Sequence, residues 1–288
     1  MISEKKVLIV GAGNAGRPVA NLFNYLNNKV TVTDSNSFDK LPKKAQNQIK
    51  ILKSRGIAFD LSGHDYNLLK SIDYVYISPN IPKTFDFIRK IYELADLGKF
   101  NIIENHDVGK ILNKLIAIPM IGIAGTDGKT TTTNMINFLL KEYFDTLIFS
   151  SLQNSLVIEG LVEMIVSGKC DNKELAIFEL PHGTIRMAEG LELNACVITN
   201  LTPDHLDEFA SYEEYIERNI AIEKLLKDNG LVLANGDDPI ISTRLSTFTH
   251  DYIVYGLRNP NTIEFDGEKY YNDDVDYDII AYDIKLMD

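Results

Sequence analysis

The sequence predicts an α/β protein built from two successive domains, each with a parallel β-sheet. Three observations predict this class. Short apolar runs of strand length alternate with amphipathic stretches along most of the chain, which is the pattern of βαβ units. This alternation starts again near residue 118. A glycine-containing loop follows a strand early in each half, at the edge where parallel sheets bind their ligands.

The strand-length apolar runs define the sheet of each half. In the first half the predicted strands are residues 7–10, 30–33, 57–61, 74–77 and 102–103. In the second half they are residues 118–123, 147–150, 175–180, 195–199, 230–234 and 252–255. Helical segments between them include residues 42–55, 85–97, 129–141 and 212–228. Such crossover helices are expected, because a tight turn cannot join two parallel strands.

No linker rich in Pro, Gly or Ser separates the two halves. We place the boundary after Ile103, which gives an N-terminal Rossmann-like domain at residues 1–103 and a second α/β domain at residues 104–288. This division rests on the point at which the strand and helix pattern restarts.

The tail of the chain follows a different pattern. Residues 262–265 and 269–271 flank Asp266-Gly267, a favourable hairpin turn. Residues 278–286 read as one further strand, after which the sequence stops. We therefore expect the second domain to be incomplete at its C-terminus.

Composition restricts the class of protein. The 288 residues are 45% hydrophobic and 24% charged, with a formal net charge of −12. No stretch approaches the ~20 apolar residues of a membrane span, and the negative charge opposes a broad hold on nucleic acid. Cys170 and Cys196 lack metal-ligand spacing, and the N-terminus lacks the form of a signal peptide. We expect a cytoplasmic protein without a membrane span or a nucleic-acid partner.

The first glycine loop contains Gly11, Gly13 and Gly16, between a strand and a helix, and Asp34 closes the next strand. Glycine lets the backbone approach a diphosphate, and the helix N-terminus offers free amides and about half a positive charge. The motif alone leaves several readings open. It is typical of a dinucleotide-dependent oxidoreductase, but similar loops bind other nucleotides or form only a tight turn.

The second loop is a P-loop that reads Gly125-Thr126-Asp127-Gly128-Lys129-Thr130-Thr131. The first glycine of the usual pattern is missing, because that position is Ile123. Its amides can hold phosphate, Lys129 can reach the terminal phosphates, and the Thr130 hydroxyl can bind magnesium. We expect this loop to bind ATP or GTP.

Three polar residues lie at or after the ends of later strands. Glu179 ends one strand, and Asn200 and His205 follow the next. Because the carboxyl ends of parallel strands meet at one edge of the sheet, we expect these residues to converge on the P-loop. A carboxylate at that edge can hold magnesium.

Taken together, the motifs resemble the Mur ligase family, in particular the branch that adds D-glutamate to UDP-muramoyl-alanine. The resemblance runs through essentially the whole chain. It is carried by the first glycine loop with Asp34, Ser78-Pro79-Asn80-Ile81, the P-loop, Glu179, the Asn-x-Thr-x-Asp-His-x-Asp run from Asn200 to Asp207, and Asn235-Gly236-Asp237-Asp238-Pro239. In this family the first domain holds a UDP-linked acceptor and the central domain holds ATP, which disfavours the oxidoreductase.

The resemblance implies an ADP-forming acid–amino acid ligase that uses ATP and Mg²⁺. It would form an amide through an acyl phosphate, in peptidoglycan or pseudomurein precursor synthesis, from a UDP-linked or other carboxylate acceptor and an amino acid. The implied catalytic residues are Lys129, Glu179 and His205. The implied metal ligands are Thr130, Glu179 and His205. The implied acceptor-binding residues are Gly11, Gly13, Asn14, Gly16, Asp34, Ser35, Ser78, Asn80, Asn154 and Asn200.

The chain departs from the family pattern in four places. Asp127 replaces the usual Asn, residues 181–184 replace a Ser-Ser-x-Gln segment, and a Ser-rich run at residues 150–155 replaces a Gly-rich one. The acceptor therefore need not be muramic acid. Asn219 stands four residues after Tyr215, where most members carry a carbamylated lysine, which leaves the second metal site in question.

By the resemblance, we expect the family's third domain to lie beyond Asp288. We therefore expect this chain to bind its ligands without completing catalysis alone, unless a missing segment or a partner chain supplies that domain. Two alternatives stay open. One is another family synthetase, of the nickel-tetrapyrrole coenzyme or folylpolyglutamate type. The other is a non-catalytic nucleotide-binding subunit.

Overall fold

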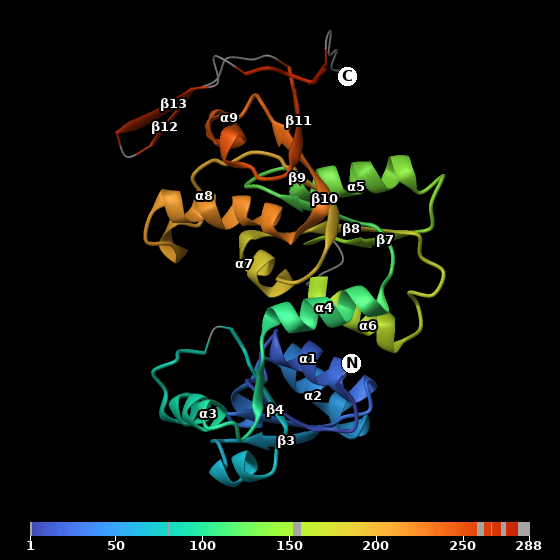
Figure 1. Cartoon of the computed structure of the whole chain (residues 1–288), viewed down its shortest axis with the longest axis vertical. Coiled ribbons are helices and arrows are strands. Elements are labelled where there is room, and N and C mark those ends of the chain that lie inside the picture. Colours follow the sequence, from blue (N-terminus) through green and yellow to red (C-terminus); the bar gives the residue numbers. More distant parts are fainter. Residues whose placement is uncertain are drawn as a thin grey trace. The chain divides into compact units, whose positions relative to one another are not determined.

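A computed structural model of the chain describes residues 2–79, 81–151, 157–257, 262–265, 267–271 and 275–281. The chain forms two compact units (Figure 1). The first unit combines Met1–Ile116 with Ile158–Asp171, and the second combines Ala117–Val157 with Asn172–Asp288. The first unit thus extends beyond Ile103, because the helix after that residue belongs to it.

The first unit contains a five-stranded parallel sheet with the strand order β3-β2-β1-β4-β5. Its strands are β1 (Lys6–Val10), β2 (Lys29–Asp34), β3 (Ala58–Leu61), β4 (Tyr74–Ile77) and β5 (Asn101–Ile103). The strands predicted for this half are confirmed. The chain leaves β1 for β2 on one side and returns to β4 on the other, so the end of β1 is the point where such sheets bind ligands.

Amphipathic helices provide much of the core of the first unit. They are α1 (Gly16–Tyr25), α2 (Lys43–Ser54), α3 (Asp86–Asp96) and α4 (Asn105–Leu115). On α3, Phe87, Ile88 and Ile91 share one face and form a buried cluster with Leu8 and Val10 of β1. Burying each such side chain contributes about 1.5–3 kcal/mol.

Helix α6 (Val157–Val166) follows a strand of the second unit in the chain, yet it clusters with the first unit. Its Glu159 accepts a hydrogen bond from Gln48 of α2 and lies 3.7 Å from the Lys44 ammonium. One helical turn further, Glu163 pairs with Arg55 at 3.5 Å. Side chains of α2 and of Arg55, which directly follows it, thus contact one acidic face of α6.

The second unit contains a seven-stranded parallel sheet with the order β14-β11-β10-β9-β6-β8-β7. Its strands are β6 (Met120–Ala124), β7 (Thr146–Phe149), β8 (Leu175–Glu179), β9 (Leu193–Ile198), β10 (Leu226–Asn235), β11 (Asp251–Gly256) and β14 (Ile279–Ile280). Its helices include α5 (Lys129–Leu140), α7 (His182–Ile185), α8 (Tyr212–Ile220) and α9 (Pro239–Arg244). Among the described residues, no helix is long and apolar enough to cross a membrane.

Two segments of this unit have bounds that differ from the prediction: one helix ends earlier, and the strand after it begins earlier. The helix predicted at residues 212–228 stops as α8 at Ile220, because Ala221–Leu225 forms a 3₁₀ turn and Leu226 already pairs with β9. The register of β10 shifts between Leu226 and Leu231, so residues that looked helical belong to an irregular strand.

The predicted tail hairpin is confirmed. It consists of β12 (Thr262–Phe265) and β13 (Glu268–Tyr271), which pair antiparallel. Of the strand predicted at residues 278–286, β14 is the part found among the described residues, and residues 282–288 lie outside them.

Candidate functional site

The P-loop joins β6 to α5, and two glycines allow its path. Gly125 has a φ of 127°, and a Cβ atom there would lie 2.2 Å from the Thr199 hydroxyl oxygen. Gly128, which caps α5, has a φ of 78°. Left-handed backbone costs a residue with a Cβ atom about 1–2 kcal/mol. Glycine at these two positions therefore permits a tight turn pressed against the end of β9.

Backbone amides at the start of α5 are available to a ligand. In the part of the chain that the structure describes, the N–H groups of residues 128–131 donate to no protein acceptor. The preceding amides are occupied, since Thr126 donates to the Asn200 carbonyl at 2.8 Å and Asp127 to its Oδ1 at 2.9 Å. Four free amides at a helix N-terminus form an anion-binding nest. The Asp127 side chain is exposed to solvent.

Lys129 lies folded over its own loop. Its ammonium donates to the carbonyl oxygens of Gly125, at 2.9 Å, and Thr126, at 2.5 Å. A phosphate oxygen is a stronger acceptor for an ammonium than a neutral carbonyl is. The lysine is thus beside the nest and has partners that a nucleotide phosphate could replace.

Side chains from the end of β9 and from α8 hydrogen-bond Thr126 and Asp127 of the P-loop. The Asp127 carbonyl accepts from Asn200 Nδ2 at 3.0 Å and from Thr199 Oγ1 at 2.7 Å. The Thr126 hydroxyl lies 2.7 Å from the hydroxyl of Tyr215, whose pKa is raised by burial. Asn200 therefore contacts the P-loop through both of its side-chain polar groups, and its role in acceptor binding stays a prediction.

Glu179, at the end of β8, reaches the start of α5. Its Oε2 accepts from the Thr130 hydroxyl at 2.8 Å and from the Ser151 amide at 2.7 Å. The Ser151 hydroxyl lies 2.8 Å from that of Thr130. Magnesium prefers oxygen ligands and commonly takes one or two protein ligands, with waters and substrate phosphates completing its shell. Thr130 and Glu179 fit such an ion.

His205 lies in a different set of contacts. It adopts a left-handed backbone with a φ of 50°. Its side chain is half exposed and lies 3.4 Å from Asp204 and 3.7 Å from Glu208. Its ring packs 5.1 Å from that of His182, which lies 3.4 Å from the same Glu208. Among the described residues, no group of three or more His, Cys, Asp or Glu side chains is arranged to hold a metal ion. The metal role of His205 stays a prediction.

Asn219 is completely buried. Its Nδ2 donates to the Tyr215 carbonyl one turn earlier, at 3.0 Å, while its Oδ1 is buried without a hydrogen-bond partner among the described residues. An amide carries no charge for a cation, so a second metal here would lack the carboxylate that a carbamylated lysine provides.

The first glycine loop joins β1 to α1 and also offers free amides. Within the described residues, the N–H groups of residues 13–16 donate to no protein acceptor. Gly16 packs so closely that a Cβ atom there would lie 1.9 Å from the Gly11 carbonyl oxygen. The Ser78 hydroxyl is buried, has no hydrogen-bond partner in the part of the chain that the structure describes, and would lie 2.7 Å from a Cβ atom on Gly11. These features favour an anionic ligand at the loop.

Asp34 supports this loop through its backbone. One carboxylate oxygen accepts from the Ala12 amide at 2.7 Å, and the other accepts from Asn36. Ser35 is exposed beside it. Asn80 and Asn154, which the sequence predicted as acceptor contacts, lie outside the described residues.

Several contacts of the two loops were not predicted from the sequence. Arg17 directly follows Gly16 and bonds the first loop. Thr199, Ser151 and Tyr215 bond the P-loop or Glu179. Thr199 and Ser151 follow the ends of strands β9 and β7, so their place in the topology was the signal available for them.

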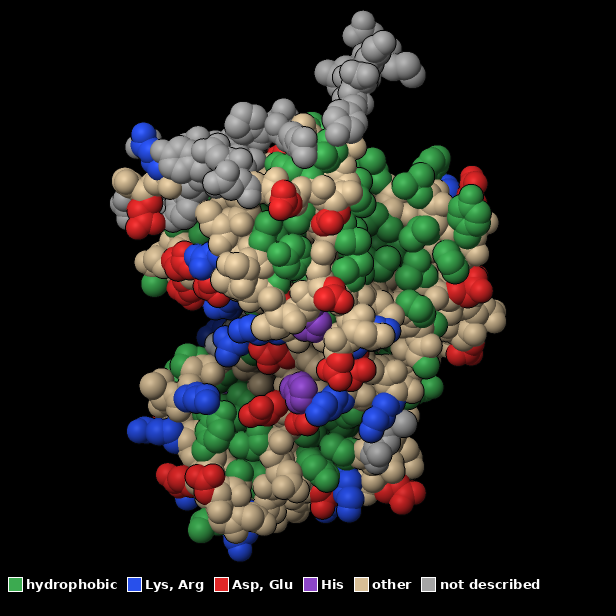
Figure 2. Space-filling model, turned by 45° about the horizontal axis from the view of Figure 1, so that its top comes forward, with side chains coloured by type: hydrophobic (Ala, Val, Ile, Leu, Met, Phe, Trp, Pro, Cys, Tyr) green, Lys and Arg blue, Asp and Glu red, His purple; other side chains and the backbone are tan. Residues whose placement is uncertain are grey.

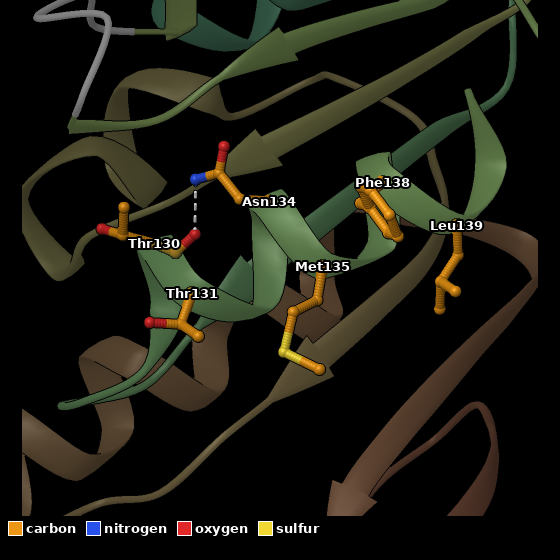
Figure 3. A pocket seen from close by; sticks show the side chains of 6 residues that line it. All are labelled: Thr130, Thr131, Asn134, Met135, Phe138 and Leu139. Carbon is orange, nitrogen blue, oxygen red and sulfur yellow. Dashed lines mark hydrogen bonds between the residues drawn. The ribbon is translucent and has the colours of Figure 1, made fainter. Parts of the chain in front are cut away.

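An apolar surface begins beside the P-loop and continues along α5. A pocket of about 550 Å³ is lined by Thr130, Thr131, Asn134, Met135, Phe138 and Leu139, as Figure 3 shows. Met135, Phe138 and Leu139 are each 60–63% exposed. Figure 2 shows hydrophobic side chains gathered on this side of the second unit.

Comparisons with known proteins agree with this arrangement. The Mur ligase middle domain matches residues 123–287. An uncharacterized protein of Methanothermobacter thermautotrophicus is 52% identical over 94% of this chain and 86% of its own length. The UDP-N-acetylmuramoylalanine--D-glutamate ligase of Pelobacter propionicus is 27% identical over 83% of this chain and 50% of its own. This chain spans about half the length of the relatives that carry the ligase name.

A solved structure shows the same fold. It is the UDP-N-acetylmuramate:L-alanyl-gamma-D-glutamyl-meso-diaminopimelate ligase from Neisseria meningitides, at 17% identity and a TM-score of 0.57. The alignment covers 93% of this chain and 86% of that one. The match of the middle domain to more than half of the sequence, with a P-loop and Glu179 in the described geometry, establishes that this chain belongs to the Mur ligase family.

Proposed function

We propose that this chain provides the acceptor-binding and ATP-binding parts of an ADP-forming carboxylate–amine ligase. The observation that carries the proposal is the meeting of Thr130 and Ser151 on one oxygen of Glu179. This joins the start of the phosphate-binding helix to a carboxylate from the neighbouring strand. Together with Lys129 and the four free amides, it gives the parts that phosphoryl transfer requires.

In the proposed reaction, an acceptor carboxylate oxygen attacks the γ-phosphorus of ATP, and the bond to the β-phosphate oxygen breaks. The products are an acyl phosphate and ADP. An amine then attacks the acyl carbon, loses a proton and expels inorganic phosphate, which forms the amide. This chemistry depends on positioning and charge neutralisation rather than on a protein nucleophile.

The residues of the second unit have definable tasks in this scheme. The amides of residues 128–131 bind the phosphates, and Lys129 leaves the Gly125 and Thr126 carbonyls to follow the charge of the transferring group. Thr130 and Glu179 would hold a magnesium ion, which supplies further positive charge when bound. His205 contributes at the acceptor end or at a second metal.

The acceptor is the less constrained part of the proposal. Among the described residues, the amides of residues 13–16 and the Ser78 hydroxyl have no protein partner, which favours a phosphate-bearing group in the first unit. A UDP-linked precursor of peptidoglycan or pseudomurein has this chemistry, and we place the reaction in the cytoplasm, where ATP is available. Residues 181–184 differ from the segment of the D-glutamate-adding branch, so the acceptor and the amino acid are expected to differ too.

The first experiment measures ADP formation by the full chain, alone and together with a partner chain that supplies the family's third domain, in the presence of ATP, Mg²⁺, UDP-linked precursors and amino acids. Lys129→Ala should abolish ADP formation and weaken ATP binding at least about 100-fold. Lys141→Ala is the matched control, because this exposed lysine stands just after the other end of the same helix. Hydroxylamine should trap the acyl phosphate as a hydroxamate.

The remaining alternatives give different results. ATP binding that depends on Lys129, without ADP formation by the chain alone or with its separately supplied partner, would favour a nucleotide-binding subunit. ADP formation with a folate or a tetrapyrrole carboxylate, but with no UDP-linked acceptor, would favour another family synthetase. ATP binding unchanged by Lys129→Ala would contradict the P-loop assignment itself.

A further inference from the structure

The first glycine loop contains a buried cation that the proposed reaction does not use. Arg17 is the second residue of α1, and only 5% of its surface is exposed. Its guanidinium donates to the Ala12 carbonyl, to Asn14 Oδ1 at 2.9 Å and to Gln48 Oε1 at 2.6 Å. All three acceptors are neutral. Buried charges are normally paired, yet Arg17 has no ion pair with a carboxylate among the described residues.

The carboxylate that acts electrostatically on Arg17 is that of Glu159, and the Gln48 side chain lies between the two. Gln48 accepts from Arg17 with its oxygen and donates to Glu159 of α6 with its nitrogen. Burial lowers the pKa of the Arg17 guanidinium, and Glu159 partly offsets that effect. The chain Arg17–Gln48–Glu159 therefore places positive charge beside the loop, and among the described residues no carboxylate bonds Arg17 directly.

The loop itself has the other features of an anion site. Its four amides at residues 13–16 are free among the described residues. The Ser78 side chain, in a residue 8% exposed, has no hydrogen-bond partner among the described residues, and its oxygen would lie 2.7 Å and 3.1 Å from Cβ atoms built on Gly11 and Gly16. The hydroxyl thus faces the space that these glycines leave open. A ligand oxygen at the loop would satisfy it.

We propose that Arg17 is a specificity-determining residue that makes the first loop select ligands with a diphosphate group. Its planar guanidinium fixes Ala12 and Asn14, the two sides of the loop, in the conformation that exposes the amides. Its uncancelled charge then favours a ligand with more negative charge. This inference rests on the proposed function only in taking the acceptor to be nucleotide-linked.

The test measures binding of UDP, UMP, uridine and inorganic pyrophosphate to the full chain by titration calorimetry. Lys129→Ala is present in every sample, so that the P-loop does not contribute. The unaltered first unit should bind UDP more tightly than UMP, and UMP more tightly than uridine. Arg17→Gln should lower the affinity for UDP about 10- to 100-fold, because it removes charge-assisted interactions. The affinity for uridine should change little. Arg17→Lys should recover part of that loss.

Two further variants separate charge from structure. Arg55→Gln is the matched control, because Arg55 bonds Asn21 of α1 and Glu163 of α6 in the same unit; it should leave the UDP preference unchanged. Exchanging Gln48→Glu with Glu159→Gln conserves total charge and the hydrogen-bond chain but moves the carboxylate onto Arg17. That double variant should lose diphosphate preference although Arg17 is still present.

Three outcomes would overturn the inference. They are equal losses of UDP and uridine affinity in Arg17→Gln, an unchanged UDP preference in the exchanged pair, and failure of the unaltered first unit to bind any of the four probes. Each is independent of the ligase assignment, which is tested by ADP formation with Lys129 intact. A chain that forms ADP while Arg17→Gln keeps its UDP preference would refute the role of Arg17 alone.

Discussion

The two glycine loops have the same local plan, since each joins a central parallel strand to a helix with free amides, but they hold their positive charge differently. In the first loop the cation is a buried arginine bonded to both sides of the loop and to a neighbouring helix. In the P-loop the cation is a lysine whose bonds, within the described residues, go to two carbonyls of its own loop. A planar guanidinium suits a fixed partner, whereas an ammonium on a flexible stem can move.

This difference corresponds to different tasks. A group that binds an unreacting part of a substrate gains from a rigid site, because less conformational entropy is lost on binding. A group that accompanies a transferring phosphoryl must follow charge from one position to another. The second loop places a side-chain hydroxyl, that of Thr130, on the Glu179 carboxylate, whereas the carboxylate at the first loop, Asp34, accepts from the backbone amide of Ala12.

The largest expected effect tests how rigid the first loop is. Gly16→Ala would place a Cβ atom 1.9 Å from a backbone oxygen, so the loop must open, at a cost of about 3 kcal/mol of unfolding free energy. Gly13→Ala meets nothing within 4 Å and should change stability by less than about 0.5 kcal/mol. Urea unfolding of the two variants provides the comparison. Equal stability of the pair would show that the loop is not as tightly packed as described.

The corresponding pair in the P-loop should separate stability from binding. Gly125→Ala combines a φ of 127° with a contact at 2.2 Å to the Thr199 side chain. We expect this variant to lose about 2–3 kcal/mol of unfolding free energy and also to lose ATP binding. Gly128→Ala has a φ of 78° but open space around the new atom, so it should cost about 1 kcal/mol. Its ATP affinity, measured by calorimetry, should fall less. A greater loss in Gly128→Ala would contradict this ranking.

The difference between the loops also shows what the sequence could predict. The strands, the positions of both loops and the approach of Glu179 to Thr130 follow from apolar periodicity and from the common edge of parallel strands. The role of Arg17 could not be predicted, because it depends on contacts of α2 with α1 and of α6 with α2. Likewise, the residues of α6 have a helical pattern that does not reveal which unit they pack with.

A smaller effect should distinguish the loops by their need for metal. Glu179→Gln keeps a hydrogen-bond acceptor for Thr130 but removes the charge that would hold magnesium. ATP affinity with Mg²⁺ should fall about 10-fold, with little change when EDTA is present. Glu174→Gln, just before the other end of β8, is the matched control. UDP binding at the first loop should be independent of magnesium in the unaltered chain and in both variants. A UDP affinity that depends on magnesium would contradict the difference in metal use between the two loops.

The smallest effect concerns pH, and it is expected for the first loop. His64 Nδ1 lies 2.9 Å from the Thr33 hydroxyl, and the Thr33 carbonyl accepts from the Gly11 amide. Burial lowers the pKa of His64 below its usual 6.5, although Asp34 and Asp60 act to raise it. The unfolded chain therefore binds this proton more readily than the folded chain. The contribution of neutral His64 to the free energy of unfolding is therefore complete above pH 6.5, and it is lost as the pH falls toward the pKa of His64 in the folded chain.

His64→Gln removes this group, so the fall in stability between about pH 7.5 and about pH 5.5 should become smaller. Urea unfolding at several pH values measures the slope, and NMR titration of the His64 ring checks the direction of its pKa shift. His106→Gln is the control, because His106 is exposed on α4. Among the described residues, the contacts that fix Thr126 and Asp127 of the P-loop come from Thr199, Asn200 and Tyr215 and include no histidine. ATP affinity should therefore change less over this pH range than UDP affinity does. The reverse result would show that the group whose titration affects binding supports the second loop and not the first.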